Sequence, residues 1–120
     1  MALVLTEEQR FLQDSAREFL SDNAPVESLR KLRDSRDAVG YSGDLWQQMV
    51  ELGWASIILP EAYGGLDFGF TGLGVVMEES GRTLTASPLF ASAVVGASAV
   101  LLGATEAQRE RNSHANAAGE

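Results

Sequence analysis

Helix start signals and helical spacing of apolar residues constrain this fold more than any other feature. Thr6-Glu7-Glu8-Gln9 and Thr105-Glu106-Ala107-Gln108 both have the form of a capping box, which satisfies free amides at a helix start. The first box is followed by apolar residues at helical spacing: Phe11, Leu12, Ala16, Phe19 and Leu20. Runs that alternate between apolar and polar residues are lacking. We therefore predict an all-α fold, an up-and-down bundle of about five or six helices.

Four further helices are predicted between the two boxes. They begin near Pro25, at Ser42 or Asp44, near Thr71 and at Pro88, and the last three end at Gly53, Gly81 and Leu102. The apolar run 54–60 is interpreted as a buried extended loop, since no second strand-like run lies nearby. Basic residues gather in the second helix and are interpreted as ordinary C-terminal cations rather than as a binding patch: Arg30, Lys31, Arg33 and Arg36.

Length and composition are those of a single globular domain. The 120 residues suffice for one domain, residues 1–120, with one core. Apolar residues make up 45% and charged residues 22%, which is ordinary for a soluble protein. The net charge of −8 gives a nucleic-acid partner little electrostatic support. Cysteine is absent, and the N-terminal MALVLTEEQ is too short in its apolar part for a secretory signal, so we expect a cytoplasmic protein.

The stretch from Thr83 to Thr105 contains no charged residue, which leaves two interpretations of the helix within it. A membrane span is one, but the helical part is shorter than the ~20 residues that a span needs. It also contains Ser92, Gly96 and Ser98. A helix that is apolar on nearly all sides is otherwise a buried one, and this is our prediction.

Two glycine segments raise the question of a phosphate site. The turn Pro60-Glu61-Ala62-Tyr63-Gly64-Gly65 could cradle a phosphate or simply reverse the chain between two helices. No glycine is followed by Lys-Ser or Lys-Thr, so there is no P-loop. Gly72-Leu73-Gly74-Val75-Val76-Met77 lacks the last glycine of a dinucleotide fingerprint and follows no predicted strand. We interpret both segments as architectural.

Titratable side chains do not form a recognisable catalytic or metal site. His114 is the only histidine, so a metal would need carboxylates alone, and no carboxylate spacing suggests one. We predict that His114 is exposed. Glu78 and Glu79 are neighbours that point apart on a helix. Because Glu78 precedes Arg82 by four residues, we predict an ion pair between these two side chains.

Several motifs occur in a telling order and spacing: Trp46-x-x-Met49-x-Glu51-Leu52-Gly53-Trp54, then Pro60-Glu61-x-Tyr63-Gly64-Gly65, then Glu78-Glu79-x-Gly81-Arg82. Together they resemble the N-terminal helical domain of the acyl-CoA dehydrogenases. Gly103-x-Thr105-Glu106-x-Gln108-x-x-Arg111 and the closing Ala118-Gly119-Glu120 resemble the last helix of that domain, so the resemblance covers nearly the whole chain. After the position of Arg111 the family usually has apolar residues, a proline and a leucine. This sequence has Asn112, Ser113, His114 and Asn116 there, so we expect the last helix to lack the side chains that would dock it.

The resemblance implies one third of an enzyme that oxidises the Cα–Cβ bond of an acyl-CoA thioester, as in fatty acid metabolism. In that family a glutamate base removes a proton and FAD accepts the hydride. Flavin and CoA contacts come mostly from a middle β domain, a C-terminal helical domain that holds the base, and a neighbouring subunit. Neither of these domains is expected in residues 1–120. We therefore expect no catalytic, metal-ligating or cofactor-binding residue here, and FAD only in the complete enzyme.

In the same family, a helix at the place of residues 88–102 helps to wall the acyl-chain pocket. The resemblance therefore implies four pocket residues: Phe90, Ala93, Val94 and Ala97. Plain core packing is the alternative for each of them. The resemblance also implies as partners an acyl-CoA substrate, the two missing domains, and further subunits of a homo-oligomer or heteromer. One side of this helix should be uncovered in the isolated chain. Two alternatives remain, a stand-alone helical module that binds an acyl chain or a protein, and a truncated product without independent activity.

Overall fold

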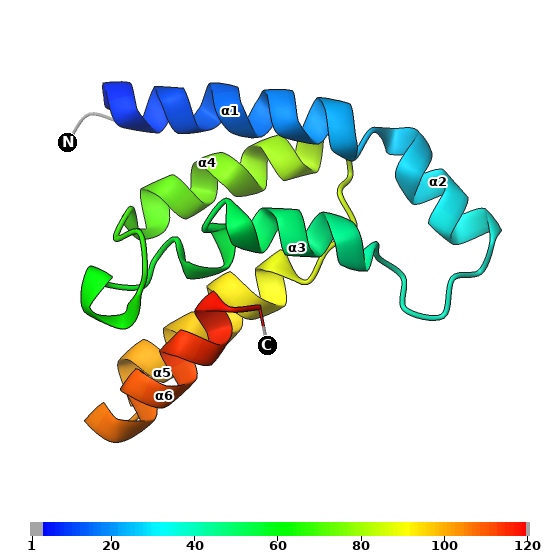
Figure 1. The fold of residues 1–120 in the computed structure, drawn as a ribbon. Coiled ribbons are helices and arrows are strands. Elements are labelled where there is room, and N and C mark those ends of the chain that lie inside the picture. Colours follow the sequence, from blue (N-terminus) through cyan, green and yellow to red (C-terminus); the bar gives the residue numbers. More distant parts are fainter. Residues whose placement is uncertain (1–3, 120) are drawn as a thin grey trace.

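Helices and the loops between them make up all of residues 4–119, which is the part that the computed structural model describes (Figure 1). The predicted all-α class and helix number are confirmed, since this part holds six α-helices and no strand. Met1–Leu3 and Glu120 lie outside it, and with them part of the MALVLTEEQ and Ala118-Gly119-Glu120 segments. The elements are α1 (Glu7–Asn23), α2 (Val26–Asp34), α3 (Gly43–Glu51), the 3-10 turns η1 (Trp54–Ser56) and η2 (Glu61–Tyr63), α4 (Gly69–Arg82), the π-helix η3 (Phe90–Gly96), α5 (Ala97–Gly103) and α6 (Glu106–Ala117).

Both predicted capping boxes are formed. At the start of α1, the Thr6 hydroxyl accepts from the Gln9 amide at 3.2 Å, and the Gln9 side chain accepts from the Thr6 amide at 3.0 Å. Thr105 and Gln108 make the same reciprocal pair at the start of α6, at 3.4 and 3.0 Å. Each box satisfies two donors that have no partner inside the helix, which stabilises the helix start.

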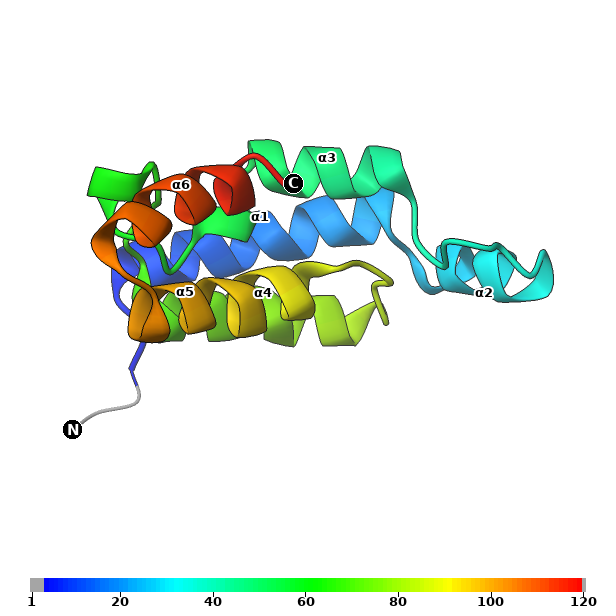
Figure 2. The ribbon, with the colours of Figure 1, turned by 90° about the horizontal axis from the view of Figure 1, so that it is seen from below.

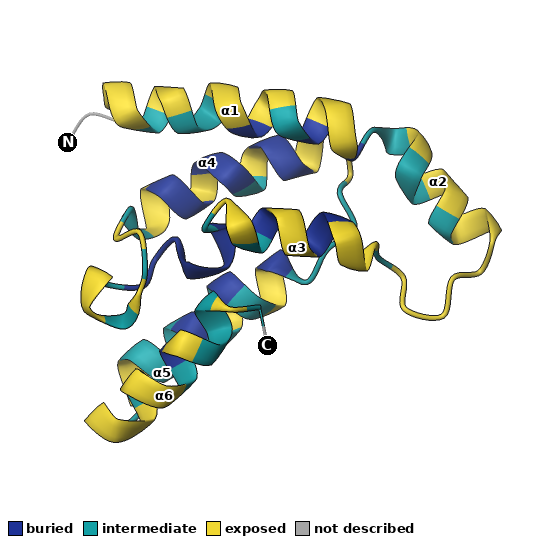
Figure 3. Cartoon of the chain, in the orientation of Figure 1, coloured by how far each residue is buried: buried dark blue, intermediate teal, exposed yellow. Residues whose placement is uncertain are grey.

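The core lies where α1, α3 and α4 face the buried segment between α3 and α4, and η3 and α5 close it from the other side (Figure 3). α1 packs along α4, while α5 and α6 form a hairpin at the opposite side of the molecule (Figures 1 and 2). The largest fully buried side chains are Leu20, Met49, Ile57, Leu59, Val76, Glu79, Leu89 and Ser113. Two of these eight are polar, so polar contacts must contribute to this core.

Phe11, from the predicted apolar stripe of the first helix, and Leu52, which follows α3, lie outside the core. The Phe11 side chain is 76% exposed and Leu52 is 46% exposed. Phe11 is five positions before the buried Ala16, which rotates it about 140° away on a helix of 3.6 residues per turn. Leu52 follows the last residue of α3 and so leaves the helical face that buries Met49. The spacing rule therefore predicts the centre of each stripe better than its ends.

The apolar run after α3 is buried, as predicted, but it is not extended. Gly53 ends α3 in the left-handed conformation with φ of 81°, and η1 then coils the chain in short turns. Ile57 and Leu59 are fully buried. A coiled path satisfies backbone groups locally, for example through the bond from the Leu59 amide to the Ser56 carbonyl at 3.0 Å, and a buried single strand could not do this.

The predicted helix from Pro88 to Leu102 is one helical rod, but its first part is a π-helix. η3 runs into α5 without a break, and the Ala97 amide donates to the Ser92 carbonyl, five residues earlier. Its burial is one-sided rather than complete. Leu89, Ala93 and Ala97 lie in the core, and the large apolar residues that are exposed on the rod are Phe90, Val95 and Leu102. The expectation of an uncovered side is confirmed.

α2 stands away from the rest of the bundle and buries no residue (Figures 1 and 2). The sequence predicts Pro25 in the first turn of this helix, but the structure places it at the N-cap. Arg30 pairs with Glu27 at 3.7 Å, and Arg33 pairs with Asp34 at 2.8 Å, all on an exposed surface. Surface pairs of this kind contribute little, which agrees with the interpretation of α2 as an ordinary solvated helix.

α6 is docked on the bundle by polar side chains, so the expectation that it lacks docking groups is wrong. The Asn116 amide group hydrogen-bonds to both η1 and η3. Ser113 is only 1% exposed, but its hydroxyl has no hydrogen-bond partner among residues 4–119, so it docks by packing alone. At the C-terminal end of α6, the Trp46 indole donates to the Gly119 carbonyl at 3.5 Å. Polar residues can replace an apolar seam when each bond is made to a buried group that needs a partner.

Candidate functional site

The four residues implied for the acyl-chain pocket divide into two pairs on the η3–α5 rod. Ala93 and Ala97 are buried, at 0% and 1% exposure, and pack on the core of this chain. Phe90 is 57% exposed and Val94 is half-buried. Phe90 therefore presents most of its side chain to the outside, whereas Val94 packs against the core and leaves only part of its side chain exposed. The two alanines let the rod approach the core closely. None of the five best-formed cavities in the described residues is lined by any of these four side chains.

The glycine turn does not form a phosphate cradle, because its amides are already engaged. Gly64 and Gly65 donate to the carbonyls of Glu61 and Pro60, at 2.9 and 3.1 Å. The next three amides, of Leu66, Asp67 and Phe68, donate at 2.9 to 3.2 Å to the carbonyls of Ser56, Leu59 and Ile57. A cradle needs amides that point to free space. The turn is architectural, as interpreted from the sequence.

Glycine is required in this turn for two separate reasons. Gly64 has φ of 80°, a left-handed conformation that other residues adopt at a cost. A Cβ atom on Gly65 would lie 1.9 Å from the Leu59 carbonyl oxygen, so the chain can fold back on itself only without a side chain there. Gly72 and Gly74 lie inside α4, and no strand precedes them in the described chain, which excludes a dinucleotide fingerprint.

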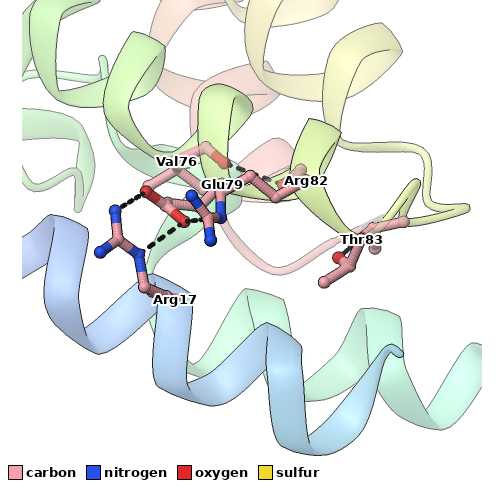
Figure 4. A network of polar contacts seen from close by, with 7 residues as sticks. Arg17, Val76, Glu79, Arg82 and Thr83 are labelled. Carbon is pink, nitrogen blue, oxygen red and sulfur yellow. Dashed lines mark hydrogen bonds and ion pairs between the residues drawn. The ribbon is translucent and has the colours of Figure 1, made fainter. Parts of the chain in front are cut away.

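The strongest electrostatic feature is a carboxylate held between two arginines (Figure 4). Arg17 of α1 donates to both oxygens of Glu79, at 2.8 and 3.1 Å, and Arg82 approaches the same carboxylate at 3.3 Å. The Glu79 side chain is 2% exposed. Hydrogen bonds from Arg17 and the charges of both arginines hold the pKa of Glu79 below its ordinary value, against the opposing effect of burial.

The sequence predicts an ion pair between Glu78 and Arg82, and the acidic residue in this prediction is wrong. Arg82 pairs with Glu79, three residues before it, and Glu78 is exposed. Glu79 lies on the face of α4 that packs on α1, where its charge needs partners. The arginines saturate this carboxylate, so it is a structural group and a poor candidate for a catalytic base.

A wide apolar groove runs along the first half of α1, and the sequence analysis did not identify it. Its volume is about 670 Å³. Aromatic and aliphatic side chains line it, with two carboxylates at one end: Phe11, Leu12, Phe19, Leu52, Trp54, Phe68, Glu7 and Glu8. Phe11 and Leu52, the residues at the ends of their stripes, would have pointed to it. The groove can hold an apolar group, and its acidic end opposes the phosphates of a CoA.

A hydrogen bond between Tyr63 and Glu106 links α6 to the glycine turn. The Tyr63 hydroxyl donates to Glu106 at 2.5 Å, which raises the pKa of Tyr63, and Arg109 lies 3.6 Å from the same carboxylate. His114 is exposed, as predicted, and its ring packs near Gly64. Residues 4–119 contain no group of three or more side chains placed to hold a metal ion. The same residues include no helix of the length and apolar character needed to cross a bilayer.

Comparison with known proteins agrees with this architecture. Residues 6–120 match the family described as "Acyl-CoA dehydrogenase, N-terminal domain". The acyl-CoA dehydrogenase IpdE2 of Mycolicibacterium smegmatis is 28% identical over 107 residues, which cover 88% of this chain and 34% of that protein. The chain belongs to the acyl-CoA dehydrogenase family and corresponds to its N-terminal helical domain.

Solved structures share the fold over nearly the whole chain. A steroid ACAD described as Tcur3481-Tcur3483 is 31% identical, with a TM-score of 0.81 over 94% of this chain and 30% of that one. The ChsE4-ChsE5 complex from Mycobacterium tuberculosis has a TM-score of 0.85 at 23% identity, over 99% of this chain and 32% of that one. The chain thus spans about a third of the length of the proteins that it matches.

Proposed function

We propose that this chain serves as the N-terminal domain of an FAD-dependent acyl-CoA dehydrogenase that introduces a double bond between Cα and Cβ of an acyl-CoA thioester. The family match over residues 6–120, together with a fold shared with the steroid ACAD at a TM-score of 0.81, carries the proposal. Among the described residues 4–119, the buried Glu79 carboxylate is engaged by two arginines, which makes it poorly suited to act as the base. The base and the flavin site belong to the other two thirds.

The role of this domain in catalysis is to wall the acyl-chain pocket and to pack against the other domains. Phe90 and Val94 would face the acyl chain from the exposed side of η3. Ala93 and Ala97 would set the depth of the wall, since their small side chains let the rod sit close to the core. The exposed Val95 and Leu102 extend this apolar face and would be covered by the missing domains.

FAD would bind to parts of the enzyme outside these 120 residues. The glycine turn cannot hold the flavin pyrophosphate through its amides, because they donate to carbonyls of residues 56–61. When bound, FAD supplies hydride acceptance, and this chain's own residues contribute only apolar surface near it. The chain alone is expected to bind no FAD and to show no dehydrogenase activity.

The partners of this domain would be the flavin-binding and C-terminal domains, an acyl-CoA and further subunits. Two structural neighbours are named for two components, ChsE4-ChsE5 and Tcur3481-Tcur3483, which favours a heteromer over a homo-oligomer. The steroid ACAD, at 31% identity, makes an acyl-CoA with a ring-containing acyl group a substrate to test beside a straight-chain one. A chain without cysteine suits the reducing cytoplasm, where we place the enzyme.

A stand-alone acyl-binding module is the second candidate, and the groove along α1 favours it. Its volume of about 670 Å³ falls in the range of small-molecule sites, and its lining is mostly apolar. In this alternative the groove, and not the η3 face, would take the acyl chain. The two candidates therefore use opposite sides of the core.

Purification of the chain alone and with the flavin-binding and C-terminal domains of its native enzyme separates the two functions. The proposal predicts a colourless protein alone and a stoichiometric flavoprotein with the other domains. The stand-alone module predicts that the isolated chain binds a long-chain fatty acid in a way that Phe11→Asp abolishes and Val95→Asp does not. Fatty-acid binding of this kind, together with failure to form a flavoprotein, would contradict the proposal.

A further inference from the structure

Asn116 of α6 joins three elements through one side chain. Its Nδ2 donates to the Ala55 carbonyl of η1 at 2.8 Å, and its Oδ1 accepts from the Ser92 hydroxyl of η3 at 3.0 Å. Ala55 is fully buried, so its carbonyl depends on this partner. With both ends of the amide engaged, the orientation of Asn116 is determined by its contacts.

Ser92 is the residue at which the wide turn of η3 closes. Its carbonyl accepts from the Ala97 amide, five residues later, where an α-helix would bond four residues later. A serine hydroxyl within a helix often turns back to a carbonyl of its own helix. Here the hydroxyl leaves the helix and donates to Asn116 instead. Ser92 thus combines the hydrogen bond at the C-terminal end of the π-helix with a contact from outside the helix.

Position 96, one turn further along the rod, faces the same side chain. A Cβ atom on Gly96 would lie 3.7 Å from the Asn116 Oδ1 atom and 3.3 Å from the Ala91 carbonyl oxygen. Asn116 therefore packs beside the η3 backbone at ordinary contact distance. π-turns are rare and occur frequently at functional sites, so a dedicated contact at one indicates a purpose beyond packing.

The register of η3 decides where Phe90 and Val94 lie. Both residues precede the Ala97 amide and belong to the wide turn. If the rod returned to α-helical bonding, this amide would bond to Ala93, and the residues before it would shift by one position relative to α5. Phe90 and Val94 would then present different surface to the outside, while Ala93 and Ala97 would leave the core positions that they now share.

We propose that Asn116 is a positioning residue of the acyl-chain pocket, which holds η3 in its π-helical register through Ser92 and so sets where Phe90 and Val94 meet the acyl chain. That Phe90 and Val94 line an acyl-chain pocket rests on the proposed function, but the π-helical register of η3 is a property of this chain. Holding this register gives a role to Asn116, a polar residue where the family's pattern has an apolar one.

The test uses Ser92→Ala and Asn116→Ala in the assembled enzyme, with Tyr63→Phe as the matched control. Tyr63→Phe also removes one hydrogen bond between α6 and a neighbouring element, but it does not touch η3. The measured quantity is the ratio of kcat/KM for a straight-chain acyl-CoA to that for a ring-containing one. Both alanine variants should change this ratio by about tenfold, as expected for a reshaped apolar pocket. Tyr63→Phe should leave it unchanged, and Ser92→Thr, which keeps the hydroxyl, should restore it.

A second readout on the 120-residue chain keeps the inference separate from the proposed function. The Val94 methyl resonances and the exchange protection of the Ala97 amide should change in both alanine variants and stay unchanged in Tyr63→Phe. An unaltered kcat/KM ratio in the alanine variants, or an equal change in Tyr63→Phe, would overturn the positioning role. If the assembled wild-type enzyme oxidises no acyl-CoA, the proposed function fails. The Val94 and Ala97 signals then decide the register claim, and their constancy would overturn it.

Discussion

Arg17 of α1 and Glu79 of α4 form a bidentate ion pair across 62 residues of sequence, with hydrogen bonds of 2.8 and 3.1 Å. The carboxylate is 2% exposed and the guanidinium 46% exposed, so the acid depends on the pair more than the base does. A buried carboxylate that loses its partners is strongly destabilising. The pair therefore couples the packing of α1 on α4 to the charge of one residue.

Acid should weaken the bundle through Glu79. The pKa of Glu79 is lowered in the folded chain, so its stabilisation is fully present above the ordinary carboxyl pKa of about 4.3 and is lost as the pH falls through the folded value. The denaturant concentration at the unfolding midpoint, measured at pH values from neutral downwards, should decrease once the pH is below about 4.3. Glu79→Gln should remove this component. An equal loss in the variant would assign the acid sensitivity to other carboxylates.

Glu78 and Glu79 offer a matched pair for a stability test, since they are neighbours of the same type on one helix. Glu78→Gln should change the free energy of unfolding by less than about 0.5 kcal/mol, as for other exposed charges. Glu79→Gln should cost about 2 kcal/mol, because hydrogen bonds to a charged group are lost. Equal effects of the two changes in urea unfolding would show that the arginines do not distinguish them.

One substitution, glycine to alanine, should act in opposite directions at two positions. At Gly65 the new Cβ would lie 1.9 Å from the Leu59 carbonyl, and backbone must move, so Gly65→Ala should cost at least about 3 kcal/mol. At Gly74, inside α4 and with open space around it, Gly74→Ala should stabilise by roughly 0.5–1 kcal/mol. Thermal unfolding of both variants measures this. Tolerance of alanine at position 65 would contradict an architectural role for the turn.

Because one side of the η3–α5 rod is uncovered, the isolated chain should self-associate while it remains helical. Phe90, Val95 and Leu102 are each more than half exposed. The chain should self-associate or bind the neutral dye Nile red, and the double change Val95→Asp and Leu102→Asp should reduce both effects. Phe11→Asp, in the groove along α1, is the matched control for dye held elsewhere. A monodisperse monomer that ignores the dye would count against a missing partner on this face.

Local signals in the sequence were sufficient for the helices. Thr6 and Thr105 start α1 and α6 through contacts three residues away, and Gly53 ends α3 through its own backbone conformation. Such features depend on neighbours along the chain, so spacing reveals them. The resemblance of the Pro60–Gly65 turn to one family added the architecture around it, and the family match over residues 6–120 confirmed that resemblance.

Contacts between distant residues were not predictable in the same way. The acidic partner of Arg82 was misassigned because spacing along α4 does not show that α1 brings Arg17 to Glu79. Asn116 appeared to weaken α6, since its partners Ala55 and Ser92 are 61 and 24 residues away. The π-helix η3 was missed because no residue type or spacing in Phe90–Gly96 marks a change from bonding four residues back to bonding five residues back. These features depend on tertiary packing, which overrides local pattern.

The central claim, that this chain belongs to a working acyl-CoA dehydrogenase, is tested most directly by anaerobic reduction of the flavin. The chain is assembled with the flavin-binding and C-terminal domains of its native enzyme, and an acyl-CoA is added in steps while the visible absorbance of oxidised flavin is recorded. We expect the absorbance of oxidised flavin to fall in proportion to the acyl-CoA added until each flavin is reduced. The proposed function would be contradicted if the flavin stayed oxidised with both a straight-chain and a ring-containing acyl-CoA, or if the assembly bound no flavin.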